Sequence, residues 1–306
     1  MNSPAPGDPP VSSPRVFSRL QLLARRIVEG LSTGLHRSPH KGASITFKQH
    51  RPYVPGDEIR RLDWHAFART DRYYIREYEQ ETNLRATLLV DLSGSMNYQG
   101  KRALASKVDY SREVALRLAT LLIQQQDAVG LITFDHTLRA ELPARSRPSH
   151  LRSISETLAR ATVGNESRLT DLFEQVAPRL GRRGLVIFLS DCFESPSVLL
   201  KGLASLRHRQ HEVLVFQIWD PDELDFPFDQ WTRFESLEIA GEHLVTDPAT
   251  LRAAYLENLQ QFRTELAAGC SRHRIDWVPL VTDRPCEDQI SSYLKRRAER
   301  RASATP

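Results

Sequence analysis

Hydrophobic positions between residues 85 and 281 follow two alternating patterns. Short apolar runs with the length of buried strands occur at 85–90, 129–134, 185–189, 213–219 and 274–280. Between these runs, apolar residues recur at helical spacing over 101–126, 150–160, 197–210 and 249–271. Strands that alternate with helices and read as continuous apolar runs are typical of a parallel sheet covered on both faces. The pattern therefore predicts an α/β fold, in which a doubly wound, mainly parallel sheet carries helices on both faces.

The remaining segments depart from this alternation. A Pro- and Ser-rich stretch over 1–15 is predicted to be disordered, and helical spacing with arginines on the opposite side predicts a basic helix over 16–40. We expect a small β-rich, polar arm over 41–84 to pack on the main domain, because its aromatic and charged groups need a partner surface. If Trp64 is buried in it, Trp64→Ala should cost about 3–5 kcal/mol. The main domain then spans 85–285, with an excursion along the sheet edge at 221–247, and a basic helix and tail follow over 286–306.

Composition and charge narrow the class of protein. The chain has 306 residues, of which 40% are hydrophobic and 26% charged, as in ordinary soluble proteins. No apolar run approaches the roughly 20 residues that span a bilayer, so we predict no transmembrane segment and a cytoplasmic location. The three cysteines are far apart in sequence, which indicates neither a disulfide framework nor a structural zinc site.

The net charge of +4 is unevenly distributed. Residues 1–51 contain eight basic residues against two acidic ones, and residues 290–306 contain five against one. Basic ends can contact nucleic acid or an anionic membrane, but solvated terminal helices are the commoner outcome. We therefore predict no nucleic-acid partner.

A cluster of oxygen-bearing side chains follows the first predicted strand of the main domain. Asp91, Ser93 and Ser95 are spaced two apart on a Gly-containing turn. Thr170 stands where a helix is predicted to begin, and Asp191 ends a later strand. The carboxyl ends of parallel strands line one crevice, so all five are expected on one rim. Hard oxygens with few carboxylates suit Mg²⁺ or Mn²⁺. The alternative is that Asp91 only ends a strand and the serines cap the next helix.

The order Asp-x-Ser-x-Ser, then Thr, then Asp is similar to the metal-ion-dependent adhesion site of von Willebrand factor A domains. The chain over about 40–296 also resembles one bacterial family, domain of unknown function number 58. The motifs that carry the resemblance lie at 53–57, 63–64, 74–78, 91–96, 127–132, 251–255 and 293–297. Proteins of this family are von Willebrand factor A-like and often encoded beside MoxR-type AAA+ ATPases. The resemblance thus implies a MoxR-type AAA+ ATPase as a partner.

The resemblance also implies roles for the five candidate residues. Asp91, Ser93 and Ser95 would bind the metal directly. Thr170 would bind it in some states, and Asp191 would reach it through a water molecule. The two residues after Asp191 are Cys and Phe where a Gly often stands, so the sequence departs from the family's pattern at Asp191 and keeps it at Asp91, Ser93 and Ser95.

Two functions from different classes remain open. The first is a non-enzymatic interaction or adaptor module, whose bound metal is completed by an Asp or Glu carboxylate from a partner protein. The second is a metal-dependent hydrolase that uses the same ion as a Lewis acid. There is no G-x-S-x-G motif around Ser93 or Ser95 and no Gly-rich phosphate cradle in the sequence, and no general base is evident near the metal. We therefore expect the interaction module and no enzymatic activity.

Overall fold

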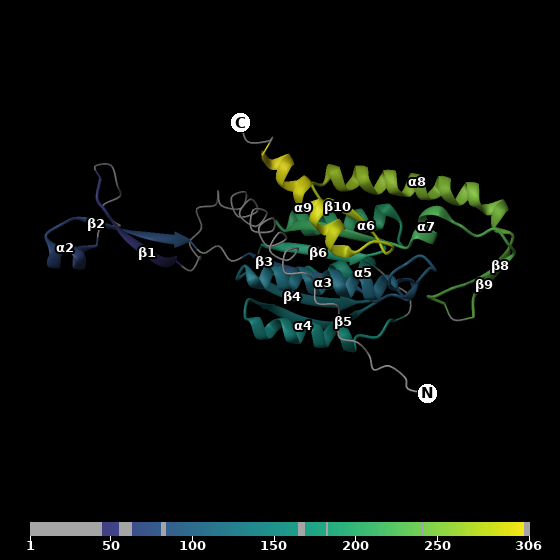
Figure 1. Ribbon diagram of the computed structural model, residues 1–306, viewed down its shortest axis with the longest axis horizontal. Coiled ribbons are helices and arrows are strands. Elements are labelled where there is room, and N and C mark those ends of the chain that lie inside the picture. The colour runs from purple at the N-terminus through teal and green to yellow at the C-terminus, as the bar shows by residue number, and fades with distance from the viewer. Residues whose placement is uncertain are drawn as a thin grey trace. The chain divides into compact units, whose positions relative to one another are not determined.

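The computed structural model describes residues 45–54, 63–80, 84–164, 169–181, 183–239 and 241–302. These residues form two compact units, one within 31–83 and a larger one that begins at Leu84 (Figure 1). The disorder expected over 1–15 and the helix expected over 16–40 lie outside the described residues. None of the helices in the described ranges is long and apolar enough to cross a membrane.

The smaller unit is a strand pair with a short helix. It contains β1 (Ile45–Pro52), α2 (Trp64–Thr70) and β2 (Tyr74–Gln80). The strands are antiparallel, and the ring of Phe67 stacks on that of Tyr73 with centroids 4.5 Å apart. Trp64 meets the edge of Phe67 and is 58% exposed. The predicted packing of this arm on the main domain stays a prediction.

The larger unit is built on a six-stranded sheet with the order β10-β7-β6-β3-β4-β5. Its strands are β3 (Arg85–Asp91), β4 (Ala128–Phe134), β5 (Leu138–Arg145), β6 (Leu185–Ser190), β7 (Glu212–Trp219) and β10 (Asp276–Val281). Every neighbouring pair is parallel except β4 and β5, which are antiparallel. The predicted α/β fold with a mainly parallel sheet is therefore confirmed. Strand β5 was not predicted. It forms the sheet edge, and its residues alternate between half-buried and exposed.

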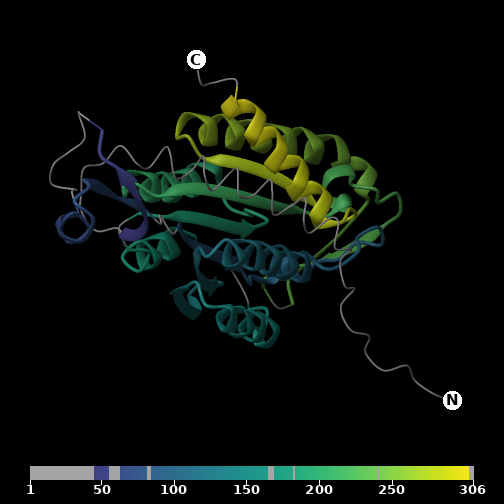
Figure 2. The same ribbon diagram turned by 60° about the vertical axis from the view of Figure 1, so that its left-hand side comes forward.

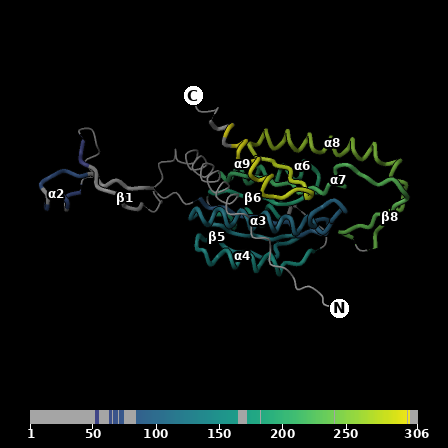
Figure 3. Tube along the Cα trace, in the orientation of Figure 1, coloured from purple at the N-terminus to yellow at the C-terminus, as the bar shows by residue number. Residues whose placement is uncertain are grey.

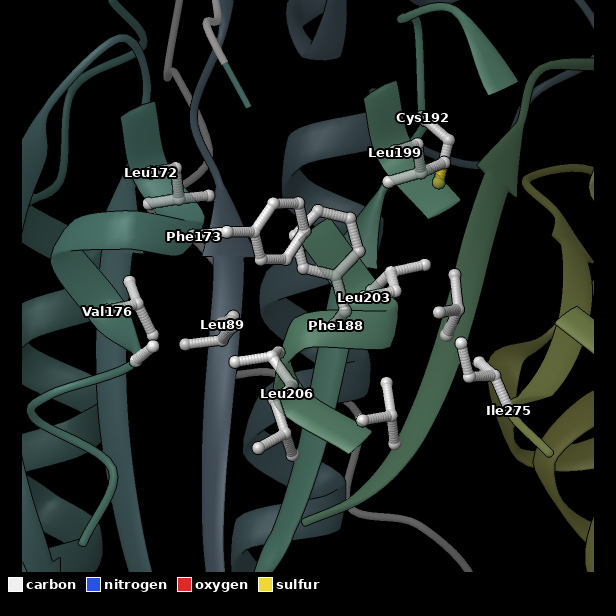
Figure 4. Packing of buried hydrophobic residues seen from close by; sticks show 14 of the residues in the cluster. Leu89, Leu172, Phe173, Val176, Phe188, Cys192, Leu199, Leu203, Leu206 and Ile275 are labelled. Carbon is white, nitrogen blue, oxygen red and sulfur yellow. The ribbon is translucent and has the colours of Figure 1, made fainter. Parts of the chain in front are cut away.

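Helices cover both faces of this sheet, as predicted (Figure 2). The helices are α3 (Lys107–Gln124), α4 (Pro148–Arg160), α5 (Leu169–Val176), α6 (Pro196–His208), α7 (Pro221–Asp225), α8 (Pro248–Arg272) and α9 (Cys286–Ala302). Phe173 of α5 packs on Phe188 of β6, within a cluster that α6 and α8 complete (Figure 4). On the other face, the ring of Phe216 meets that of Tyr293 from α9. Each such buried side chain contributes about 1.5–3 kcal/mol.

The segment over 221–247 leaves the sheet after β7. It forms α7 and then a hairpin of β8 (Thr232–Glu235) and β9 (His243–Thr246), which pair only with each other within the described residues (Figure 3). The ring of Phe226, the residue after α7, stacks on that of Phe234 in β8 and meets that of Tyr255 in α8 at a tilt. The hairpin is thus anchored at its base by aromatic contacts. The sequence predicted an excursion along the sheet edge, but the turn of this hairpin lies against the loop that follows β3.

Candidate metal site at the carboxyl rim of the sheet

Asp91 is the last residue of β3 and is 1% exposed. Its Oδ1 accepts a hydrogen bond from the N–H of Ser93 at 2.9 Å, and its Oδ2 accepts one from the Ser190 hydroxyl at 2.6 Å. Burial and, after it, the neighbouring charge of Asp191 raise the pKa of Asp91 to about 7, against the opposing effect of the hydrogen bonds from Ser190 and Ser93. The hydrogen-bond donors that hold this carboxylate are neutral, so a cation at Asp91 would favour its ionised form.

The two serines lie close together on the turn after β3. The Oγ atoms of Ser93 and Ser95 are 3.2 Å apart. Neighbouring ligands in the octahedral shell of Mg²⁺, each 2.0–2.1 Å from the ion, lie about 3 Å apart. Ser93 precedes a short 3-10 helix (Gly94–Asn97), but its side chain makes no capping hydrogen bond. The spacing therefore fits a pair of metal ligands, and the alternative that Ser93 serves as a helix cap is wrong.

Asp191 follows β6 directly and is 5% exposed. Its Oδ2 lies 2.8 Å from the Nζ of Lys107, and its Oδ1 accepts a hydrogen bond from the N–H of Phe193 at 3.2 Å. Cys192 has a φ of 60°, in the left-handed region that favours glycine. Cys192, which stands where the family often has a Gly, thus occupies a position where a Gly would fit without strain.

Lys107 is a residue of this rim that the sequence did not predict. It is the first residue of α3 and is 1% exposed, and its Nζ also lies 2.5 Å from Oε1 of Glu223. Burial acts to lower the pKa of Lys107, but the charges of Asp191 and Glu223 outweigh it and raise that pKa. The ammonium group is therefore charged and bridges two carboxylates. The sequence did contain a signal for this buried lysine. Lys107 lies four residues before Ser111 and seven before Val114, on the buried side of the predicted helix.

Thr170 is the second residue of α5 rather than the residue before the helix. Its side chain lies outside the part of the chain that the structure describes. The structure therefore brings Asp91, Ser93, Ser95 and Asp191 to one rim, at the ends of the adjacent strands β3 and β6.

The chemistry of these donors fits a hard divalent cation on the Asp91 side of the rim. Asp91, Ser93 and Ser95 offer one buried carboxylate and two hydroxyl oxygens, which Mg²⁺ and Mn²⁺ accept. Within the described ranges, no group of three or more His, Cys, Asp or Glu is placed to hold a metal ion. A site here would thus depend on hydroxyl oxygens, because Asp191 already has a cation in Lys107.

Comparisons with known proteins place the chain in a family. A family model described as "Protein of unknown function DUF58" matches residues 49–265. Uncharacterized proteins of Mycobacterium bovis and Mycobacterium tuberculosis are each 26% identical to this chain over 293 residues, 93% of this chain and 89% of each relative.

Two solved structures are also similar to the chain. One is the conserved hypothetical protein BatB from Bacteroides thetaiotaomicron, with a TM-score of 0.45 and 16% identity over 71% of this chain and 100% of that one. The other is the SpRpn10 VWA domain, with a TM-score of 0.41 and 13% identity over 71% of this chain and 95% of that one. Because the family model matches well over half of its residues, the chain belongs to the family described as protein of unknown function DUF58.

Proposed function

We propose that this protein is a metal-dependent protein-interaction module without enzymatic activity. Asp91, Ser93 and Ser95 would hold Mg²⁺ or Mn²⁺, and a carboxylate of a partner protein would complete the coordination. The observation that carries the proposal is the pair of serine hydroxyls, 3.2 Å apart, beside a buried carboxylate held by neutral donors. When bound, the ion would supply a Lewis-acidic position for an incoming Asp or Glu.

The other residues of the rim would prepare that position. Ser190 fixes the carboxylate of Asp91 through its hydroxyl. Lys107 pairs with Asp191 and Glu223 and offsets part of their negative charge, so an incoming acidic side chain meets less repulsion. Thr170 as a further ligand and Asp191 as a ligand through water are retained from the resemblance as part of the proposal.

No contact within the described residues favours the metal-dependent hydrolase. Such an enzyme needs a general base beside the ion. Asp191 and Glu223, two carboxylates of this rim, both form ion pairs with Lys107. An interaction module needs no such base.

We further propose a cytoplasmic MoxR-type AAA+ ATPase as the partner, with the chain acting as an adaptor in the assembly or maturation of protein complexes. The support for this partner is the family to which the chain belongs and the gene neighbourhood that the resemblance implies. It is a proposal about the partner, separate from the metal site.

The test is co-purification of the full chain with a MoxR-type ATPase from the same genome. Binding should require Mg²⁺, and EDTA, Asp91→Asn or Ser93→Ala should each abolish it while the fold persists by circular dichroism. Asp229→Asn is the matched control, because Asp229 is an exposed acidic residue. Binding that survives EDTA and both rim substitutions would show that the rim is not the interface.

A further inference from the structure

A groove follows the outer edge of β10, the last strand of the sheet. It is a cavity of about 590 Å³, lined by residues of α8, β10 and α9 together with the end of α6 and the start of β7. Both α8 and α9 contact β10, and Figure 2 shows the strand between them. The groove lies near the amino ends of β7 and β10, whereas the candidate metal site lies at the carboxyl ends of β3 and β6. Its volume is within the range of about 300–1,000 Å³ that is typical of ligand pockets.

The floor of the groove carries backbone groups that face away from the sheet. Val281 of β10 donates its N–H to Oε1 of Gln289 at 3.0 Å and accepts from Nε2 of Gln289 at 2.8 Å, so its backbone faces away from β7. Backbone groups of successive strand residues point to opposite sides, so Trp277 and Pro279 face the same outer edge. Pro279 has no N–H. Trp277 has both backbone groups, and no hydrogen bond within the described residues takes them up.

Three arginines line this groove without a carboxylate partner within the described residues. They come from three elements: Arg207 from the last turn of α6, Arg274 from the loop after α8, and Arg296 from α9. The guanidinium of Arg207 donates to the backbone carbonyl of His211 at 2.8 Å. Arg274 and Arg296 are exposed. Guanidinium groups bind carboxylates strongly, often through two parallel hydrogen bonds.

The acidic side chains of the groove already have partners. Glu212 and Asp276 both form ion pairs with Arg297, whose side chain is 12% exposed. The hydroxyl of Tyr293 also donates to Asp276 at 3.1 Å. These contacts hold the two carboxylates on the wall of the groove. The three other arginines are left in excess, so the groove favours an occupant with negative charge.

We propose that this groove binds an extended acidic segment of a partner protein. One residue of the segment would exchange backbone hydrogen bonds with Trp277, as when a peptide adds a strand to a sheet edge. Successive side chains of an extended segment point to opposite sides, so neighbouring Asp or Glu residues would reach Arg274 after α8 and Arg296 on α9. Pro279 and Gln289 limit the pairing to a short stretch, so the arginines supply most of the recognition. The binding requires no metal ion and goes beyond the function proposed for the rim.

Fluorescence anisotropy of a labelled peptide tests the proposal on the full chain. The probe has about nine residues in Glu-Glu-Val repeats and spans about 30 Å when extended. The parent should bind it, more weakly as salt is added, and EDTA should leave the affinity unchanged. The double variant Arg274→Gln/Arg296→Gln should bind at least roughly tenfold more weakly, because it loses two charged hydrogen-bond donors. Arg274 has a φ of 55°, so Arg296→Gln is also measured alone, and it should weaken binding while the circular dichroism spectrum stays that of the parent.

Arg160→Gln is the matched control, because Arg160 is an exposed arginine of α4, which contacts the opposite edge strand β5. It should bind the peptide as the parent does. A peptide of Lys-Lys-Val repeats tests the charge and should not bind. An N-methylated form of the Glu-Glu-Val peptide keeps its charge and lacks backbone donors, so it should bind more weakly than the unmodified peptide.

Several results would overturn the proposal. Equal binding of the Glu and Lys peptides, or equal binding by the parent and Arg296→Gln, would show that the arginines do not select an acidic segment. Equal binding of the N-methylated peptide would exclude strand pairing at Trp277. Citrate that displaces the peptide at the same concentration of carboxylate groups would assign the groove to a small anion. No binding of the Glu peptide at about 1 mM would exclude the site, and because this binding needs no metal, the proposed function at the rim would stand.

Discussion

Asp91 and Asp191 end adjacent parallel strands, yet their surroundings differ. The carboxylate of Asp91 accepts hydrogen bonds from the Ser93 amide and the Ser190 hydroxyl, which carry no charge. The carboxylate of Asp191 lies 2.8 Å from the ammonium of Lys107. In the sequence pattern the two aspartates act as a pair on one metal ion. Within the described residues the structure gives them different neighbours, because Asp191 lies beside the ammonium of Lys107 and Asp91 accepts from neutral donors.

The substitution Lys107→Met tests this comparison with the largest expected effect. It would leave Asp191 and Glu223 together in a buried site without their cation. Breaking a buried ion pair in this way costs about 3–5 kcal/mol. The free energy of unfolding, measured by urea titration, should fall by about that amount.

Lys201→Met is the control, since Lys201 is an exposed lysine of α6 and should change stability by no more than about 0.5 kcal/mol. Added Mg²⁺ should recover part of the stability that Lys107→Met loses, because Asp191 without Lys107 is available to bind the added cation. Equal stability of the two variants would contradict the role given to Lys107.

Asp127 is a buried carboxylate at the other end of the sheet, and it can be compared with Asp91. Its Oδ1 accepts a hydrogen bond from the N–H of Leu84 at 2.9 Å, and burial raises the pKa of Asp127 to about 7. The unfolded state has the lower pKa, so it loses its proton first as the pH rises. Stability therefore decreases between about pH 4 and pH 7 and levels off above pH 7.

Asp127→Asn keeps the acceptor for Leu84 and removes the charge. The variant should be more stable than the parent by roughly 2 kcal/mol at pH 8 and by much less at pH 4, as measured by urea unfolding. A stability difference that does not change with pH would refute the raised pKa. Mg²⁺ should stabilise Asp127→Asn as much as the parent, which distinguishes a buried carboxylate from a metal ligand.

Ser190→Ala has the smallest expected effect. Its hydroxyl donates to Asp91 and accepts from the N–H of Cys192, so the variant leaves two buried groups with one hydrogen bond fewer. We expect a loss of about 1–2 kcal/mol without Mg²⁺ and a smaller loss with Mg²⁺, because the ion holds the carboxylate in place of the serine. Ser153→Ala, at an exposed position of α4, is the control. A loss that is the same with and without Mg²⁺ would argue against a metal at Asp91.

The sequence alone was sufficient to predict features that depend on neighbouring residues in the chain. Asp91, Ser93 and Ser95 lie within five residues of one another after a buried strand, so their spacing alone brings them together. The alternating pattern of β5 was also a local signal, although a short edge strand close to its neighbour was missed. The ring of Trp64 contacts Phe67 of its own helix, which is also a local contact.

The remaining contacts depend on tertiary structure. Lys107 meets Asp191 and Glu223 across separations of 84 and 116 residues. The approach of Leu237 to Gly94 depends on how the hairpin base packs on α7 and α8, for which no short motif exists. These contacts give the two aspartates different surroundings, and they were not accessible from spacing alone.

Thermal unfolding with and without Mg²⁺ tests the central claim most directly. At ten times its dissociation constant, Mg²⁺ should stabilise the parent by about 1.4 kcal/mol and raise its Tm by roughly 3–6 °C. Asp91→Asn, which keeps the shape of the side chain and removes its charge, should show no such rise, whereas Asp229→Asn should show the full rise. An equal rise in the parent and in Asp91→Asn would contradict a metal site at Asp91.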